Sequence, residues 1–204
     1  PANSTLTLPV TCIEAGRWHA KSARFNTSAR AVYSQLRAAK SADVTLSLRT
    51  ARKRSANQHR TWDAINEKMA RMESPSDTGA MADIFENYEA TLAGYAQAVQ
   101  PKSNQVGAVF AINGRVCGMD MFDHPRTLSR LLPKLVQSYA LDAIDQARIA
   151  TQAAATPAPA LKNFLKQLRV VAAEPYPAIG LGTDLRFDDA QVSGGALAVD
   201  EKVV

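Results

Sequence analysis

The sequence has little of what marks metalloproteins and membrane proteins. It contains only two cysteines and three histidines among 204 residues. The histidines lie in different segments, and none stands at metal-ligand spacing from a Cys, Asp or Glu. No apolar run approaches the roughly 20 residues that a membrane-spanning helix needs. We therefore predict no metal site and no association with a membrane.

Motifs for nucleotide binding or nucleophilic catalysis are also missing. There is no P-loop and no nucleophile elbow. Gly180-Leu181-Gly182 lacks the third glycine and the following helix of a dinucleotide fingerprint. No secretory signal is visible. Cys12 and Cys117 both lie in apolar, strand-like runs, which is typical of reduced, buried cysteines in a cytoplasmic protein, with a disulfide as the alternative.

The strongest local pattern is a hairpin within residues 105–123. Apolar residues alternate before and after Asn113-Gly114, a pair that favours the positive φ angles of a two-residue turn. The opposite faces of both runs are apolar too, so we expect strands that are buried on both sides. Asp120 interrupts this apolar run, and a buried carboxylate there needs a partner or a proton.

The remaining elements follow from periodicity. Pro125 suits the first turn of a helix capped by Asp123, and Pro133 is expected to kink or split that helix. Asp142 and Asp145 fall on its exposed side. Spacing predicts further helices at about 56–73, 78–100 and 161–168, and strands at 6–12, 43–49, 170–174, 184–187 and 192–199, with Gly194-Gly195 as a bulge or a site of close approach.

These elements predict a single α+β domain over residues 1–204. Mostly antiparallel strands form an N-terminal group and a central hairpin, which the C-terminal strands can join, and three or four helices pack around them. Residues 150–160 are rich in Ala, Pro and Thr, a composition that indicates a flexible linker. The first predicted strand begins only a few residues after the start of the sequence, and the last is very short. We therefore expect a fragment of a longer chain that lacks a β-rich N-terminal segment.

Charge is unevenly distributed along the chain. The net charge is +5, but residues 17–60 contain 11 Lys or Arg and one acidic residue. Such asymmetry indicates an anionic partner, for example a nucleic acid, a nucleotide or an acidic protein face. The alternative is a solvated basic surface, since no recognised nucleic-acid-binding motif accompanies the charge.

Two groups of polar residues are candidates for a ligand site. Cations interleave with aromatic residues at Arg17, Trp18 and Arg24, an arrangement that can stack on a base or hold a phosphate. Thr78 and Gly79 precede a predicted helix, whose free N–H groups at 78–81 can hold an anion. The alternatives are core aromatic residues with snorkelling arginines, and an ordinary helix cap.

Carboxylates supply the candidates for catalysis. Asp120 and Asp123 flank the exit of the hairpin, and Glu14 follows the first predicted strand. Two of these carboxylates in one pocket could do acid–base work or hold a divalent cation. The alternative is that each of them forms a separate ion pair or caps a helix.

Several blocks together resemble the ARG-and-rhodanese-phosphatase-superfamily-associated protein domain family, in which ARG denotes ADP-ribosylglycohydrolase. The resemblance spans nearly the whole chain and is most specific at 106–123. It implies association with ADP-ribose-linked and NAD-linked enzymes, and it implies no established activity or catalytic residue. The blocks are residues 8–14, 16–18, 22–25, 76–81, 106–123, 131–136, 138–143, 180–182 and 184–186.

We therefore predict a binding or sensor module for a nucleotide-like anion in ADP-ribose or NAD metabolism. The first alternative is a hydrolase that acts on such compounds through the carboxylates Asp120, Asp123 or Glu14. A weaker alternative is nucleic-acid binding through residues 17–60. The sequence leaves the cofactors and the oligomeric state open.

Overall fold

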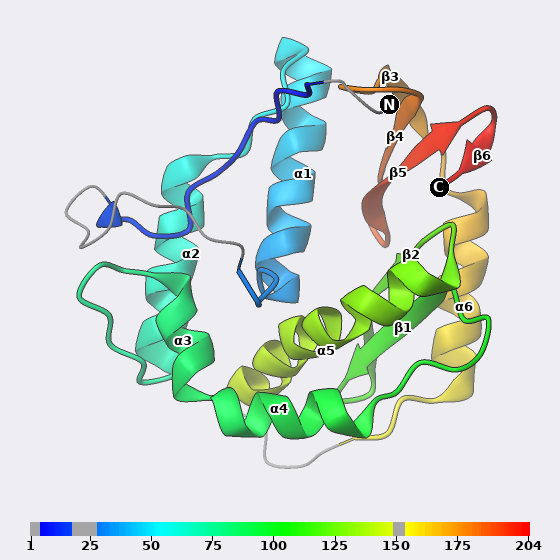
Figure 1. The fold of residues 1–204 in the computed structure, drawn as a ribbon. Coiled ribbons are helices and arrows are strands. Elements are labelled where there is room, and N and C mark those ends of the chain that lie inside the picture. The colour runs from blue at the N-terminus through cyan, green and yellow to red at the C-terminus, as the bar shows by residue number, and fades with distance from the viewer. Residues whose placement is uncertain (1–4, 18–27, 149–153) are drawn as a thin grey trace.

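The structure is a computed structural model, and it describes residues 5–17, 28–148 and 154–204. These residues form an α+β fold with two antiparallel sheets, as predicted, and with six helices, more than the three or four expected. In Figure 1, α5 crosses the middle of the molecule, between α2 and α3 on one side and the β1–β2 hairpin with α6 on the other. The elements are α1 (Ser34–Ala51), α2 (Gln58–Arg71), α3 (Met81–Asn87), α4 (Glu89–Ala98), β1 (Gly107–Ile112), β2 (Arg115–Met121), α5 (Pro125–Ala147), α6 (Ala158–Val170), β3 (Glu174–Pro177), β4 (Thr183–Asp188), β5 (Ser193–Val199) and β6 (Lys202–Val203).

The central hairpin forms a sheet of its own. β1 and β2 pair antiparallel, with Ile112 opposite Arg115. The two residues between them, Asn113 and Gly114, have φ angles of 48° and 79°, the positive values that a turn of this length requires. The C-terminal strands do not join this hairpin, because they form a second sheet in the order β3-β4-β5-β6. The strand pair is only partly buried, so the expectation of burial on both faces is wrong.

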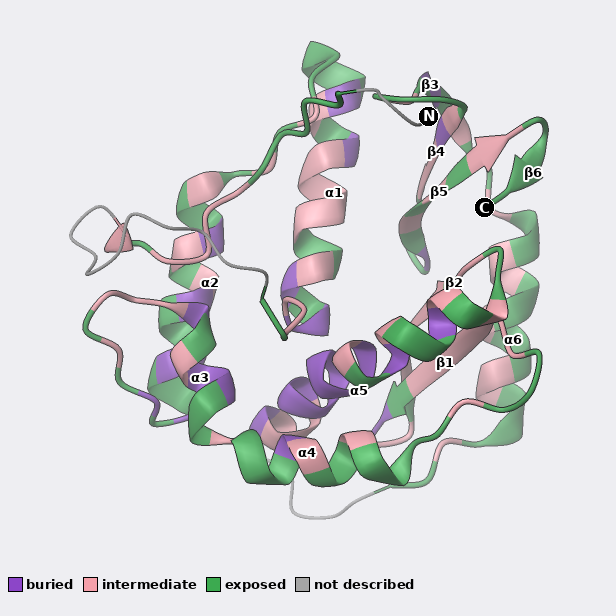
Figure 2. Cartoon of the chain, in the orientation of Figure 1, coloured by how far each residue is buried: buried purple, intermediate pink, exposed green. Residues whose placement is uncertain are grey.

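The core lies along α5, where buried residues concentrate in Figure 2. Its first half packs on the hairpin, with Leu128 and Leu132 buried against Ala108 and Phe110. Its second half joins a core shared with α1, α2, α3 and α4. The helix is not split at Pro133. Leu132 before the proline and Leu135 and Val136 after it are buried in the same cluster against the hairpin, which holds the helix continuous across it. Its N-cap is His124, which accepts the N–H of Arg126, and not Asp123 as predicted.

The segment predicted as a strand at 43–49 is helical and belongs to α1. Thr45 and Leu48 are buried, whereas Leu46 is 58% exposed. The apolar alternation therefore misidentified the buried face, which follows helical spacing and includes a threonine. Thr45 donates from Oγ1 to the carbonyl of Ser41 and so satisfies its hydroxyl within the helix.

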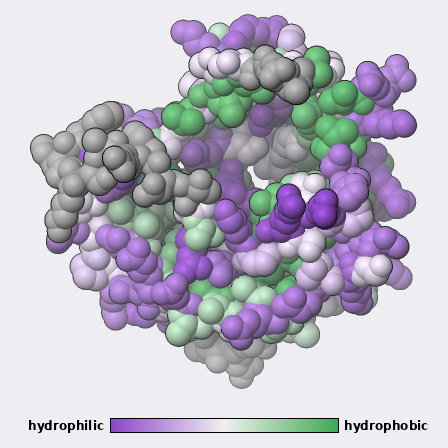
Figure 3. Space-filling view, in the orientation of Figure 1, coloured by the Kyte–Doolittle hydropathy of each residue, from purple (hydrophilic) through white to green (hydrophobic). Residues whose placement is uncertain are grey.

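The predicted N-terminal strand at 6–12 is also absent from the described residues. This segment crosses α1 and α2 as an extended chain (Figure 1), and a single β-bridge follows it between Glu14 and Ala80. Leu6 and Leu8 are 52% and 60% exposed, and Figure 3 shows hydrophobic residues gathered across the upper part of this face. Among the described residues no strand pairs with the segment, so its alternating pattern does not produce a sheet there.

The N-terminal segment is attached to α2 through Cys12. The Gln58 side chain accepts the backbone N–H of Cys12 at 2.8 Å and donates to its carbonyl at 2.7 Å. Cys12 and Cys117 are both free thiols, but Cys117 is exposed and Cys12 only half-buried. The expectation that both cysteines lie in the core is therefore wrong.

Two further boundaries differ from the sequence-based expectation. The helix predicted over 78–100 is interrupted at Tyr88, whose hydroxyl donates to the carbonyl of Met72, and it forms α3 and α4. Part of the predicted linker at 150–160 lies outside the described residues, and its last three residues begin α6.

At the C-terminal end, the strand predicted at 170–174 is misplaced. The Pro-Tyr-Pro run expected to end it lies instead inside the edge strand β3. Gly194 is paired in register with Phe187, and a Cβ there would lie 2.8 Å from the Phe187 ring. The absence of a side chain at Gly194 therefore allows the Phe187 ring to approach the backbone of β5 closely, which is one of the two roles expected for the glycine pair.

Candidate functional site

Four of the predicted site residues meet beside the loop that precedes α3. Arg17 pairs with Glu14 at 3.2 Å, and Thr78 donates from Oγ1 to the other carboxylate oxygen of Glu14 at 2.8 Å. The N–H of Gly16 donates to the carbonyl of Thr78, next to Gly79. Trp18 and Arg24 lie outside the described residues.

The anion site expected at 78–81 is filled largely by the chain itself. The N–H of Ala80 donates to Ser76 Oγ at 2.9 Å, and the N–H of Met81 donates to the carbonyl of Ile13 at 3.0 Å. A backbone N–H that is already bonded to the protein is not free to hold an anion. This cluster is therefore better explained as the attachment of the N-terminal segment to α3.

Asp120 lies in a different place from Glu14. Its carboxylate forms a bidentate salt bridge with Arg37 of α1, at 2.8 and 3.2 Å. It also accepts a hydrogen bond from the hydroxyl of Tyr139 at 3.2 Å. The hairpin that carries Asp120 lies beyond α5 from the segment that carries Glu14 and Arg17 (Figure 1). Asp123 is exposed. The three candidate catalytic carboxylates thus do not converge on one site, and the cation that meets Asp120 comes from α1.

Asp120 shifts the pKa values of both Arg37 and Tyr139. Burial alone would lower the pKa of Arg37, but the hydrogen bonds and charge of Asp120 raise it overall. The pKa of Tyr139 is raised by burial and by the charge of Asp120. The Tyr139 ring stacks on Phe110, with 3.9 Å between ring centroids. Gly118 lets the hydroxyl approach β2, because a Cβ there would lie 2.5 Å from Tyr139 Oη.

A buried charge cluster was missed by the sequence analysis. Lys68 of α2 is fully buried, and its Nζ lies 2.7 Å from Asp142 and 2.8 Å from Asp145, both on α5. The same Nζ lies 4.5 Å from the centroid of the Tyr33 ring. The expectation that Asp142 and Asp145 face solvent is therefore wrong, since both are buried. A signal was present: Lys68 stands in the apolar stripe of α2, and a lysine there needs carboxylate partners.

Asp142 also caps the start of α1. The N-cap residue Tyr33 provides no side-chain hydrogen bond to the helix. Asp142 instead accepts the backbone N–H of Gln35 at 2.9 Å and the hydroxyl of Ser34. A carboxylate near a helix N-terminus satisfies an unpaired N–H and interacts favourably with the helix dipole. We therefore assign this cluster a structural role in orienting α1, α2 and α5.

More than half of the basic residues in segment 17–60 form ion pairs within the chain. Six of its arginines form ion pairs, and two of these, Arg49 and Arg54, pair with acidic residues more than a hundred positions away. Six carboxylates outside the segment thus offset part of its net charge of +10, which weakens that charge as an indication of a nucleic acid. The pairs are Arg17–Glu14, Arg30–Glu89, Arg37–Asp120, Arg49–Glu174, Arg49–Asp188, Arg54–Asp184 and Arg60–Asp43.

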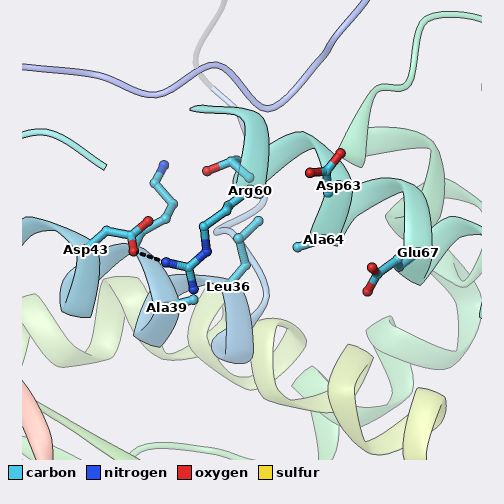
Figure 4. Close-up of a pocket in the computed structure, with 9 residues that line it drawn as sticks. Leu36, Ala39, Asp43, Arg60, Asp63, Ala64 and Glu67 are labelled. Atoms are coloured by element: carbon cyan, nitrogen blue, oxygen red, sulfur yellow. Dashed lines mark hydrogen bonds and ion pairs between the residues drawn. The ribbon is translucent and has the colours of Figure 1, made fainter. Parts of the chain in front are cut away.

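A polar pocket of about 310 Å³ lies between α1 and α2 (Figure 4). Arg60 reaches across it from α2 to Asp43 on α1, at 2.5 Å, and Asp63 and Glu67 follow further along α2. Arg60 near the start of α2 meets Asp43 midway along α1, whereas Lys68 near the end of α2 meets Tyr33 at the start of α1, so the two helices run in opposite directions. The lining residues are Leu36, Ala39, Lys40, Asp43, Arg60, Thr61, Asp63, Ala64 and Glu67.

Lys40 is the distinctive cation of this pocket. It is half-buried, and burial lowers its pKa, although neighbouring Cys12 acts in the opposite direction. No carboxylate pairs with it among residues 5–17, 28–148 and 154–204. A half-buried ammonium group without a carboxylate partner, at the wall of a pocket, is a candidate ligand-binding group. The sequence analysis included Lys40 and Arg60 only in the net charge of residues 17–60, because neither residue belongs to a local sequence motif.

Two kinds of site find no support in the described part of the chain. No group of three or more His, Cys, Asp or Glu is arranged to hold a metal ion there. None of the helices described combines the length and the apolar character needed to cross a membrane.

Comparison with known proteins gives a family assignment. The sequence model of the ARG and Rhodanese-Phosphatase-superfamily-associated Protein domain matches residues 1–204. The chain belongs to this family. Neither the curated proteins nor the solved structures compared with it include a match. The resemblance drawn from the sequence blocks is thus confirmed.

Proposed function

We propose that the chain is a binding module for a phosphorylated ribose compound of the kind found in ADP-ribose and NAD. The observation that carries the proposal is the pocket between α1 and α2 with Lys40 at its wall. Its volume of about 310 Å³ falls within the range of small-molecule sites, which is roughly 300–1,000 Å³. The family name, which associates these domains with ADP-ribosylglycohydrolases, supports the same ligand class.

The distribution of charge in the pocket supports a phosphorylated sugar over a polyanion. Lys40 adds a positive charge to the lining and lies three residues before Asp43, which Arg60 neutralises. Asp63 and Glu67, further along α2, make that end acidic. Since a carboxylate accepts hydrogen bonds from hydroxyl groups and repels phosphate, we assign the phosphate to Lys40 and the ribose hydroxyls to the acidic end.

Binding is testable by thermal unfolding with AMP, ribose 5-phosphate, ADP-ribose and NAD, each compared with adenosine. A ligand at about a hundred times its Kd stabilises the folded state by about 2.7 kcal/mol. For a chain of this length, that corresponds to a rise in Tm of roughly 5–11 °C. Adenosine, which lacks the phosphate, should give a much smaller shift.

Two lysine variants provide the control. Lys40→Met should remove the ligand-induced shift, whereas Lys162→Met, at an exposed position on α6, should leave it unchanged. The proposal fails if none of the four phosphates raises Tm, or if Lys40→Met responds as the unaltered chain does.

The same samples address the hydrolase alternative. Chromatography would detect cleavage of ADP-ribose or NAD into smaller products. Cleavage that Asp120→Asn or Glu14→Gln abolishes would favour an enzyme over a binding module.

A further inference from the structure

A second, larger pocket lies between the N-terminal segment and the C-terminal sheet. It has a volume of about 650 Å³ and is lined mostly by apolar residues. Leu6 and Leu8 form one wall, and Ile179, Leu181 and Leu197 contribute to the other. Leu181 is 64% exposed and Leu197 is 40% exposed. Apolar surface of this extent, gathered in a concave site, is typical of a binding site for an apolar group.

The same pocket contains an excess positive charge. Arg54 and Arg186 both line it, and both pair with one carboxylate, that of Asp184. Arg186 donates from Nε at 2.7 Å and from Nη2 at 3.0 Å, and Arg54 donates from Nε at 3.2 Å. Two guanidinium groups thus share one negative charge, and the three side chains are only 11–21% exposed.

Each of these arginines retains hydrogen-bonding capacity. Besides Asp184, Arg54 donates from Nη2 to the carbonyl of Pro177. The Nη1 group of neither arginine has an acceptor within the described residues. Because guanidinium groups bind carboxylates through paired N–H donors, the pocket offers a place for one additional anionic group.

We propose that this pocket binds a medium-chain fatty acid, with its carboxylate at Arg54 and Arg186 and its alkyl chain along the leucine wall. The apolar lining and the excess positive charge together favour a ligand that has both an alkyl chain and a negative charge. A neutral apolar partner would leave the excess charge unmatched, and a compact anion would leave the leucines exposed. A flat protein surface would reach the leucines but not the recessed arginines. The proposal is independent of the pocket between α1 and α2, which contains none of these residues.

The test is calorimetric titration of the purified chain with decanoate, octanoate and decanol. Decanoate should bind at least tenfold more tightly than decanol, because only the acid carries the charge. Since burying a methylene contributes ~0.8 kcal/mol, each methylene added between octanoate and decanoate should tighten binding about fourfold. Equal affinity for decanol and decanoate would overturn the proposal.

Variants separate the two parts of the site. Arg54→Met removes the excess charge and leaves Asp184 paired with Arg186, so it should weaken decanoate about tenfold and leave decanol unchanged. Leu181→Gln should weaken both ligands. Leu46→Gln, at a leucine that is 58% exposed on α1 and outside the pocket, is the matched control and should change neither.

Three further outcomes would overturn the assignment. The first is that Leu181→Gln and Leu46→Gln bind decanoate equally well. The second is that Lys40→Met abolishes decanoate binding, since that residue lies outside this pocket. The third is self-association that Leu181→Gln abolishes and decanoate does not compete with, which would assign the apolar wall to a second copy of the chain.

Discussion

The buried cluster of Lys68, Asp142 and Asp145 gives the sharpest prediction about stability. Asp142→Asn preserves the shape of the side chain but removes its charge. Lys68 is then left fully buried with Asp145 as its remaining carboxylate, at 2.8 Å. The amide oxygen can still accept the N–H of Gln35, so the cap on α1 is weakened rather than lost.

The expected magnitude follows from these contacts. Removing one partner of a buried ion pair costs ~3–5 kcal/mol. Because Asp145 still faces Lys68 and part of the cap survives, we expect the lower end, ~3 kcal/mol. For a chain of 204 residues, this lowers Tm by roughly 6–12 °C. Glu86→Gln, which neutralises an exposed carboxylate on α3, should change the free energy of unfolding by less than ~0.5 kcal/mol.

Urea unfolding followed by circular dichroism measures these changes. A double-mutant cycle of Lys68→Met and Asp142→Asn isolates the pair, and the double variant should lose ~1–2 kcal/mol less than the sum of the single variants. A loss below ~1 kcal/mol for Asp142→Asn, or additive single variants, would refute the argument that Lys68 depends on this carboxylate.

The cluster also predicts sensitivity to acid. Burial would raise the pKa of Asp145, but hydrogen bonds from Arg71 and Lys68 outweigh it and lower the pKa below 3.8. As pH falls below this ordinary value, the unfolded chain binds a proton first, so the stability contributed by Asp145 is progressively lost. Asp145→Asn should make the free energy of unfolding less dependent on pH in this range.

Two further predictions concern the glycines and Tyr139. Gly118→Ala should cost ~1–3 kcal/mol, because its Cβ would lie 2.5 Å from Tyr139 Oη. Gly94→Ala in α4, where a Cβ meets nothing within 4 Å, should instead stabilise by ~0.5–1 kcal/mol, and equal effects of the two in urea unfolding would contradict the packing argument. The raised pKa of Tyr139 predicts that stability falls as pH rises above 10.0, since the unfolded chain releases the proton first. Tyr139→Phe should lessen this fall, and an unchanged pH profile would count against the contact with Asp120.

Elements with a strong local pattern were predictable from the sequence. The turn residues Asn113 and Gly114 lie in the expected hairpin, and the apolar stripe of α2 lies in the core. Both features depend on interactions between residues close in the chain. The strand predicted at 43–49 failed because an apolar alternation of a few residues fits a strand and also part of a helix. Packing of α1 against its neighbours decided between the two.

In the candidate site, too, some residues were predicted from the sequence and others are brought together only by the fold. Glu14, Arg17 and Thr78 were predicted and do meet, but their contacts attach the N-terminal segment to the loop before α3. Lys40 and Arg60 were not selected, because they belong to separate helices that pass each other only in the folded chain.

The sequence by itself determined the α+β composition, the family and the central hairpin. The tertiary structure alone decided which charges meet: Asp142 with Lys68, and Asp120 with Arg37. The physical reason is that local periodicity reports the conformation of neighbouring residues, whereas the cost of burying a charge is offset by a partner that any distant segment can supply.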